Sequence, residues 1–363
     1  MERDELEAWL RLAETPGLSR GAGRRLLAAL ASPEAVLGAS AATLRQIAGS
    51  EAADALAAPP PGFAERLEAT ARWLAAADGG PRALLVLGDP RYPKALLETA
   101  DPPLLLFVQG RVELLGTPAL AIVGSRNPTP QGLDNARAFA AHLARAGLTI
   151  VSGLALGIDG AAHEGALTGS GSTVAVIGTG PDRVYPKRHL ELARRIARDG
   201  AIVSEFPLGT PALPVNFPQR NRLIAGLTQG TLVVEAALQS GSLITARLAA
   251  EAGREVFAVP GSIHSPQTRG CHALIKQGAK LVEGAADILD ELAQPGPRAI
   301  APAAAPAADP LLEALGHDPV SIDALVARTG WPPETLNASL LELELAGRVA
   351  RLPGQLFQRR SAT

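Results

Sequence analysis

Residues 119–130 read ALAIVGSRNPTP, a short apolar run followed by a turn of small and polar residues. Residues 119–123 have the length and composition of a buried strand, and Gly124 allows the sharp turn that follows. An amphipathic stretch near 131–146 then predicts a helix. Because a buried strand, a turn and a helix form half of a βαβ unit, this stretch predicts a parallel sheet covered by helices.

The same alternation of apolar runs and amphipathic stretches continues along the middle of the chain. We expect strands at 119–123, 148–152, 173–177, 201–204, 231–235 and 255–259, and helices near 131–146, 159–168, 188–198, 218–227 and 242–252. This order predicts an α/β fold with a Rossmann-like, doubly wound, mainly parallel sheet. Since ligands bind at the carboxyl ends of the strands in such sheets, the loops that follow these strands should meet at one crevice.

The remaining sequence predicts further domains around this sheet. Residues 1–80 are rich in Ala and Leu at helical spacing and predict a small helical domain, and residues 81–292 hold the sheet. Pro and Ala dominate 293–308, which is typical of a linker. Residues 309–363 fit three helices and two short strands, the outline of a winged helix. A glycine-rich hairpin at 15–25 could hold a phosphate, but the negative charge of its segment favours a packing role.

The composition limits the compartment and the partners. The apolar runs are far shorter than the roughly 20 residues of a membrane-spanning helix, and the acidic amino terminus lacks the features of a secretory signal. Cys271 is the single cysteine, so no intrachain disulfide can form and a metal anchor is not indicated. We therefore expect a cytoplasmic protein without a membrane partner.

The net charge of −2 conceals a basic middle segment. Residues 116–290 carry 16 Lys and Arg against 13 Asp and Glu, whereas both flanks are acidic. Because this excess is small, a site for a polyanion must be a local cluster of cations.

Three predicted loops carry residues suited to a phosphate or a base. In the first, Gly124 and Ser125 let backbone N–H groups approach an anion at a helix N-terminus, and Arg126 adds a charge-assisted contact. The second loop contributes Gly153, and the third places Lys187 beside Tyr185, whose ring can stack on a base. The alternative is that these glycines only turn the chain and the cations are solvated surface charges.

The stretch 217–222, Phe-Pro-Gln-Arg-Asn-Arg, is the most informative. Its proline suits a first helical turn, so Arg220, Asn221 and Arg222 should lie near a helix N-terminus, where phosphate is favoured. Phe217 adds a surface for stacking.

Arg220 and Arg222 should have different partners. Side chains two positions apart on a helix point in different directions. One arginine is therefore expected to contact phosphate, while the other braces the loop or an acidic residue such as Glu205 or Glu235.

A last Gly/Ser turn, with Gly241, Ser242 and Thr245, also suits phosphate, but it lacks the lysine of an ATP-binding P-loop. No loop matches the G-x-G-x-x-G dinucleotide pattern, so we expect no cofactor. His163 has no H-E-x-x-H partner, which favours a buried, hydrogen-bonded histidine over a metal ligand or a base. No metal site is predicted.

Taken together, these loops resemble the DprA/Smf family of DNA-processing proteins. The matching motifs are Gly-Ser-Arg at 124–126, Ser-Gly-Leu-Ala-x-Gly-Ile-Asp-x-x-Ala-His at 152–163, Tyr-Pro-Lys at 185–187, Phe-Pro-x-Arg-Asn-Arg at 217–222 and Ser-Gly-Ser-Leu-Ile-Thr-Ala at 240–246. The resemblance implies a SAM-like amino-terminal helical domain, an extended Rossmann-like DNA-binding domain and a carboxy-terminal winged helix.

The resemblance also implies a function. A family member binds and protects single-stranded DNA, forms a homodimer and helps to load the recombinase RecA in natural transformation, and it is not known as an enzyme. Carried over by motif, the DNA-binding residues are Gly124, Ser125, Arg126, Gly153, Lys187, Phe217, Arg220, Asn221, Arg222, Gly241, Ser242 and Thr245. Pro214 stands where many relatives have a basic residue, which weakens a phosphate contact there or shifts it to Lys187.

Two further expectations concern an alternative enzymatic function and the role of the winged helix. A Rossmann-like nucleotide phosphoribohydrolase would also use glycine-rich phosphate loops, with Glu205 or Glu235 as its acid or base. The expected recognition helix of the winged helix, 333–342, contains no Lys or Arg. We therefore expect that domain to serve partner contact or DNA-linked regulation rather than sequence reading.

Overall fold

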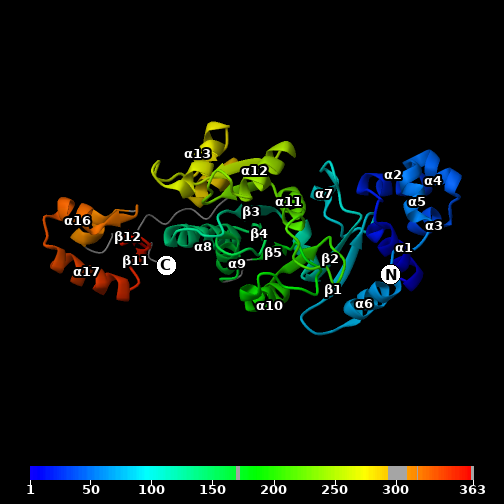
Figure 1. Ribbon diagram of the computed structural model, residues 1–363, viewed down its shortest axis with the longest axis horizontal. Helices are drawn as coiled ribbons and strands as arrows, with labels where there is room; N and C mark the ends of the chain where they lie inside the picture. Colours follow the sequence, from blue (N-terminus) through cyan, green and yellow to red (C-terminus); the bar gives the residue numbers. More distant parts are fainter. Residues whose placement is uncertain (169–171, 293–308, 317, 361–363) are drawn as a thin grey trace.

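The computed structural model describes residues 1–168, 172–292, 309–316 and 318–360. Figure 1 shows an elongated molecule, with a helical region at one end, the sheet in the middle and a small helical and stranded domain at the other end. The expected linker, 293–308, lies outside the described residues. In the part of the chain that is described, no helix combines the length and the apolar character needed to cross a membrane.

Short amphipathic helices build the amino-terminal region. They are α1 (Arg3–Glu14), α2 (Arg20–Leu30), α3 (Pro33–Gly38), α4 (Ala41–Ala48), α5 (Ser50–Leu56) and α6 (Phe63–Ala75). The side chains of Ser19, Ser32 and Ser40 cap α2, α3 and α4 by accepting hydrogen bonds from backbone N–H groups. The apolar faces of α1 and α6 pack on β1 and β2, which joins this region to the sheet.

A nine-stranded sheet forms the centre of the molecule. Its strands are β1 (Arg82–Val86), β2 (Leu105–Gly110), β3 (Ala119–Val123), β4 (Thr149–Ser152), β5 (Thr173–Val176), β6 (Ala201–Ser204), β7 (Gly230–Val233), β8 (Glu255–Ala258) and β9 (Lys280–Leu281). Their order is β1-β2-β6-β5-β4-β3-β7-β8-β9. Neighbouring strands from β6 to β9 pair in parallel, and each of the six predicted strands lies within two residues of its expected ends.

The sequence did not predict β1, β2 and β9 as strands. β1 pairs with β2, and β2 with β6, in antiparallel register, so the edge of the sheet departs from the βαβ alternation.

Helices cover both faces of the sheet. They are α7 (Lys94–Leu97), α8 (Pro130–Arg145), α9 (Ile158–Ala166), α10 (Leu190–Asp199), α11 (Asn216–Gly226), α12 (Ser242–Glu251), α13 (Arg269–Lys276) and α14 (Ala285–Glu291), with 3-10 turns η1 (Val112–Gly116), η2 (Lys187–His189) and η3 (Pro266–Thr268).

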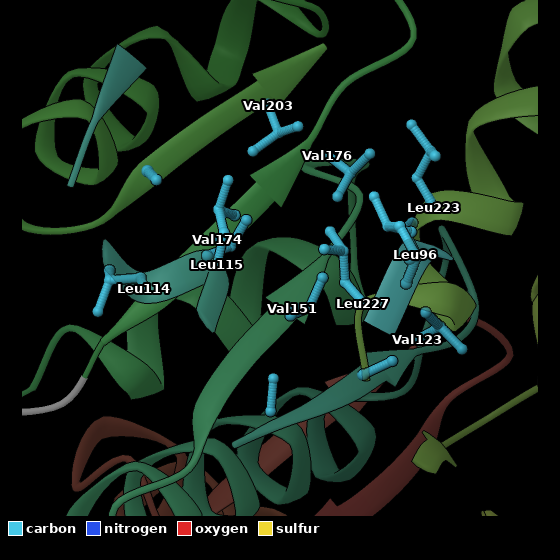
Figure 2. Close-up of a cluster of buried hydrophobic side chains, with 14 of the residues drawn as sticks. Leu96, Leu114, Leu115, Val123, Val151, Val174, Val176, Val203, Leu223 and Leu227 are labelled. Carbon is cyan, nitrogen blue, oxygen red and sulfur yellow. The ribbon is translucent and has the colours of Figure 1, made fainter. Parts of the chain in front are cut away.

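Alternation along the strands creates two apolar layers. In β3, Ala121 and Val123 belong to the cluster under α11 and α12, whereas Leu120 and Ile122 belong to the cluster under α8, α9 and α14. Figure 2 shows the first of these clusters, where Leu223 of α11 packs with strand valines. The doubly wound, mainly parallel α/β sheet predicted from the sequence is therefore confirmed.

The strand order reverses between β3 and β7. From β3 the sheet continues through β4, β5 and β6 on one side and through β7, β8 and β9 on the other. The loops after β3 and β7 therefore lead away to opposite faces of the sheet and leave a crevice between them, which is where ligands bind in open α/β sheets.

The last domain has the predicted winged-helix outline. It consists of α15 (Pro310–Leu315), β10 (Val320–Ser321), α16 (Ile322–Thr329), α17 (Pro333–Leu345), β11 (Val349–Leu352) and β12 (Leu356–Arg359). Arg360 donates to both carboxylate oxygens of Asp134, at 3.0 and 3.2 Å, and Gln358 donates to Gln131 at 2.8 Å. These contacts seat the end of the wing on the first two turns of α8 (Figure 1).

Candidate nucleic-acid interface

A pocket of about 650 Å³ lies at the crevice where the strand order reverses. The loops after β3 and β7 and the start of α11 form its walls. Nine of the twelve predicted site residues line it: Gly124, Ser125, Arg126, Phe217, Arg220, Asn221, Gly241, Ser242 and Thr245. The structure does not bring the other three, Gly153, Lys187 and Arg222, to the pocket wall.

The first wall is the turn between β3 and α8. The Ser125 hydroxyl accepts the backbone N–H of Asn127 at 3.1 Å, and the Thr129 hydroxyl caps α8 by accepting the N–H of Gly132 at 3.0 Å. These bonds hold the turn rigid while the Arg126 side chain stays exposed to solvent. The guanidinium of Arg126 favours an anion at this wall, whereas the N–H groups at the start of α8 already bind Glu235 and Thr129.

Phe217 lies at the centre of a group of aromatic and cationic side chains. The Tyr185 ring lies 5.5 Å from it between centroids at an angle of 41°, and the guanidinium carbons of Arg126 and Arg220 lie 5.7 and 6.0 Å from its centroid. Tyr185 is 50% exposed, so its ring is available for a further stacking partner. The arrangement offers an aromatic surface and positive charge at one place, which suits bases joined by phosphates.

Arg220 is buried, whereas the motif suggested a side chain that reaches a phosphate. Its guanidinium donates to the backbone carbonyls of Gly153, at 2.5 Å, and of Val176. Burial lowers the pKa of Arg220 to about 10, which still leaves it charged at neutral pH, with the buried carboxylate of Asp159 nearby. Arg220 therefore forms a positively charged floor of the pocket rather than a free arm.

Gly153 serves this buried arginine. A Cβ atom at position 153 would overlap the Arg220 guanidinium, so only glycine leaves room for it. The Asp159 carboxylate accepts the N–H groups of Gly153 and Ala155, at 3.1 and 3.3 Å, and burial raises the pKa of Asp159. The structure thus gives Gly153 a packing role beneath Arg220.

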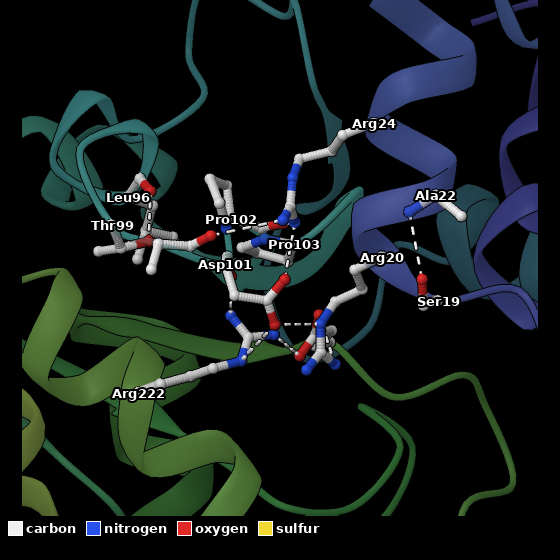
Figure 3. A network of polar contacts seen from close by, with 12 residues as sticks. Ser19, Arg20, Ala22, Arg24, Leu96, Thr99, Asp101, Pro102, Pro103 and Arg222 are labelled. Atoms are coloured by element: carbon white, nitrogen blue, oxygen red, sulfur yellow. Dashed lines mark hydrogen bonds and ion pairs between the residues drawn. The ribbon is translucent and has the colours of Figure 1, made fainter. Parts of the chain in front are cut away.

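Arg222 points away from the pocket into a cluster of ion pairs, the junction network, which consists of Arg20, Arg24, Asp101, Glu205 and Arg222 (Figure 3). Arg222 pairs with Glu205 and donates to the Asp101 carbonyl at 2.6 Å. One of the two arginines of the motif was expected to brace an acidic residue, and Arg222 is that arginine.

Arg20 and Arg24 join the helical region to the junction network. Their guanidinium nitrogens lie 2.6 and 2.7 Å from the Asp101 carboxylate oxygens. The network thus fixes α2 to the segment before β2 and to α11, which gives the glycine-rich hairpin a packing role.

Lys187 starts η2 and is exposed. Among the described residues, no acidic side chain lies within ion-pair distance of Lys187 or of Arg126. Both cations are therefore free to meet a polyanion, although Lys187 lies outside the wall of the pocket itself.

The opposite wall is the Gly/Ser turn that leads into α12. The hydroxyls of Ser240 and Ser242 lie 2.7 Å apart, and the Asn221 side chain donates to the Gly241 carbonyl at 3.4 Å. Asn221 thus links the start of α11 to this turn and fixes the position of one pocket wall relative to the other.

Comparisons with known proteins agree with this geometry. Residues 83–293 match the family described as DNA recombination-mediator protein A, and residues 294–355 match the DprA winged helix domain. Protein Smf of Escherichia coli (strain K12) is 46% identical over 283 residues, which cover 75% of this chain and 76% of that protein. The chain belongs to the DprA/Smf family.

Members of the family also match in structure. The X-ray structure of DNA processing protein A (DprA) from Streptococcus pneumoniae superposes with a TM-score of 0.67 at 38% identity, covering 78% of this chain and 97% of that one. A DNA processing protein A from Helicobacter pylori, described for its single-stranded DNA binding mode, has a TM-score of 0.54 at 31% identity, covering 59% of this chain and 96% of that one.

Some residues of the pocket wall were absent from the prediction. Asn127, Gln239 and Gln267 add side-chain amides to the wall. The first two adjoin DprA/Smf motifs and could have been found by extending these motifs. Gln267 lies in η3 after β8, and no pattern in the sequence links it to the pocket.

The two glutamates of the alternative enzyme have other partners. Glu205 is paired with Arg222, both carboxylate oxygens of Glu235 accept hydrogen bonds from Thr129, and neither glutamate lines the pocket. His163 is buried and hydrogen-bonded to Thr173 at 2.7 Å, and burial lowers its pKa to about 3, which matches the expected structural histidine. Within the described ranges, no cluster of His, Cys, Asp and Glu side chains could hold a metal ion.

Proposed function

We propose that this chain binds single-stranded DNA in the pocket between the loops after β3 and β7. The contact of Arg126 with Phe217, beside the exposed Tyr185 ring, carries this proposal. The Arg126 side chain supplies positive charge for a phosphate, and the aromatic side chains supply a surface for unpaired bases. A relative from Helicobacter pylori, described for its single-stranded DNA binding mode, supports the same ligand.

Single strands suit this site better than duplex DNA. Stacking on Tyr185 requires a base whose face is free, and the bases of a duplex are already stacked. Helix α17, which would enter the major groove of a duplex, carries no Lys or Arg. In this proposal Arg126 and Lys187 contact phosphates, Tyr185 and Phe217 form the stacking surface, and the turn at 240–245 shapes the opposite wall.

Further parts of the proposal rest on the family. We propose that the protein acts in the cytoplasm as a homodimer in DNA recombination and transformation, and that it helps to load RecA onto the bound strand. We also propose that it carries out no catalytic step at the pocket, since Glu205 and Glu235 are held by hydrogen bonds elsewhere. Light scattering of the purified chain, with and without RecA and DNA, tests the assembly.

The binding test is a salt titration with fluorescently labelled DNA. The full-length protein should bind an oligothymidylate more tightly than a hairpin duplex, and its affinity should fall as salt rises. Arg126→Ala should weaken binding about tenfold and reduce the salt slope by about 0.7, the contribution of one phosphate contact on a single strand. Arg45→Ala, an exposed arginine on α4 in the helical region, is the matched control. Equal binding by Arg126→Ala and the wild type contradicts the proposed site.

A further inference from the structure

Glu235, two residues after the end of β7, holds both ends of the turn that carries Arg126. The backbone carbonyl of Glu235 accepts the N–H of Ser125 at 2.7 Å. The Glu235 carboxylate accepts the backbone N–H of Thr129 at 2.9 Å and the Thr129 hydroxyl at 2.6 Å. Arg126 lies between these two anchors, so the position of its backbone depends on Glu235.

The first turn of α8 is shaped around this carboxylate. A Cβ atom at Gly132 would lie 2.5 to 2.8 Å from the carboxyl atoms of Glu235, closer than any real contact, so the glycine lets the helix sit directly on the acid. Since Thr129 also caps α8, the carboxylate determines where the helix begins as well as where the turn ends.

Among the described residues, no cationic side chain lies within ion-pair distance of the Glu235 carboxylate. The side chain is buried, and burial raises the pKa of Glu235 while the hydrogen bonds from Thr129 lower it. The positive end of the α8 dipole adds to these hydrogen bonds. Burying a carboxylate costs free energy unless hydrogen bonds compensate for the lost water. Breaking the bonds from Thr129 would therefore be unfavourable, so they hold the turn in place.

We propose that Glu235 is a positioning residue of the DNA site, which acts through Thr129 to set Arg126 for a DNA phosphate. This inference rests on the proposed function, because it explains how the phosphate contact of Arg126 is fixed. Glu235 itself does not touch the bound strand, since it lies behind the turn and outside the pocket wall.

The test is a double-mutant cycle on the full-length protein, with oligothymidylate as the probe. Glu235→Gln keeps the size of the side chain but turns one acceptor into a donor. Thr129→Val removes the hydroxyl that donates a hydrogen bond to the carboxylate. Each should weaken binding about five- to tenfold and lower the salt slope toward that of Arg126→Ala. Thr129→Ser keeps the hydroxyl and should bind like the wild type.

The decisive measurement combines each variant with Arg126→Ala. If Glu235 acts through Arg126, then Glu235→Gln or Thr129→Val should change the affinity of the Arg126→Ala protein by less than about twofold. An equal loss in both backgrounds would overturn the inference, because it would reveal a general effect on the fold. Thermal melting of each protein identifies unfolded variants, and Thr129→Val then carries the test if Glu235→Gln does not fold.

The outcomes separate this inference from the function itself. If Arg126→Ala binds weakly while Glu235→Gln and Thr129→Val bind normally, the positioning role is wrong and the DNA site stands. If Arg126→Ala binds as the wild type does, the proposed DNA site is wrong, and the positioning role is wrong with it.

Discussion

The pocket and the junction network both take an arginine from α11, yet they use it in opposite ways. At the junction network, Arg222 is surrounded by acids and tied to Glu205 and Asp101. At the pocket, Arg220 meets backbone carbonyls, and Arg126 has no acidic partner among the described residues. Positive charge is thus neutralised where domains join and left available where a polyanion is proposed to bind. A motif arginine that already pairs with carboxylates, as Arg222 does, has less charge available for a phosphate.

The largest expected effect separates the two regions by stability. Arg222→Ala leaves the largely buried Glu205 without its main partner, and loss of one member of such a pair costs about 3 kcal/mol of unfolding free energy. The salt slope of DNA binding should not change. Denaturant unfolding and DNA titration of the same preparation measure both quantities. A lower slope with unchanged stability would place Arg222 at the DNA.

The next effect belongs to the pocket. Phe217→Ala removes the ring that contacts Tyr185 and Arg126, and loss of one stacking platform costs about 2 kcal/mol of binding free energy. Because a phenylalanine carries no charge, the salt slope should stay close to that of the wild type. Anisotropy titrations at several salt concentrations test this. Affinity equal to that of the wild type would remove Phe217 from the site.

A smaller effect concerns the glycine beneath Arg220. Gly153→Ala places a methyl group against the buried guanidinium, and overpacking of this kind costs about 1.5 kcal/mol of stability. DNA binding should weaken as well, because the displaced Arg220 lies under Phe217. Gly38→Ala, at the end of α3 with open space around it, is the control and should change neither property. A tolerated alanine at 153 would contradict the packing role.

The smallest effect is the pH dependence of the junction network. Burial acts to raise the pKa of Asp101, but Arg24, Arg20 and Arg222 outweigh it and lower the pKa. A carboxylate with a lowered native pKa contributes stability that is present above the unfolded-state pKa and is lost as pH falls below about 4. Since Asp101 is one-third exposed, we expect this contribution to stay below about 1 kcal/mol.

Comparison of wild type and Asp101→Asn isolates this contribution. The difference in their unfolding free energies should shrink as pH is lowered from 6 to about 3. A difference that is independent of pH would show that the charge of Asp101 does not stabilise the junction.

Local patterns predicted most of the sheet and one side of the site. The apolar run 119–123, its glycine turn and the helix after it follow from periodicity and turn chemistry, and the structure places them accordingly. β1 and β2 were not predicted because β2 pairs with the distant strand β6, and β1 is joined to the sheet only through β2. The contact of Arg360 with Asp134 has the same origin, since it joins residues more than 200 positions apart.

The roles of individual site residues were harder to predict. Helical spacing showed that Arg220 and Arg222 diverge, but only the fold shows that Asp101 and Glu205 lie beside Arg222. Glu235 was a candidate acid or base by its place at a strand end. The fold places its carboxylate under the first turn of α8, where it accepts two hydrogen bonds from Thr129.

Ultraviolet crosslinking of the full-length protein to oligothymidylate, followed by mass spectrometry of the peptides, tests the central claim most directly. The DNA adducts should fall on peptides that contain Tyr185 and Phe217, because these rings are expected to stack on the bases. They should disappear at high salt and in the presence of unlabelled single-stranded competitor. Adducts confined to the winged helix or to α1–α6, with none around the pocket, would contradict the claim that single-stranded DNA binds between the β3 and β7 loops.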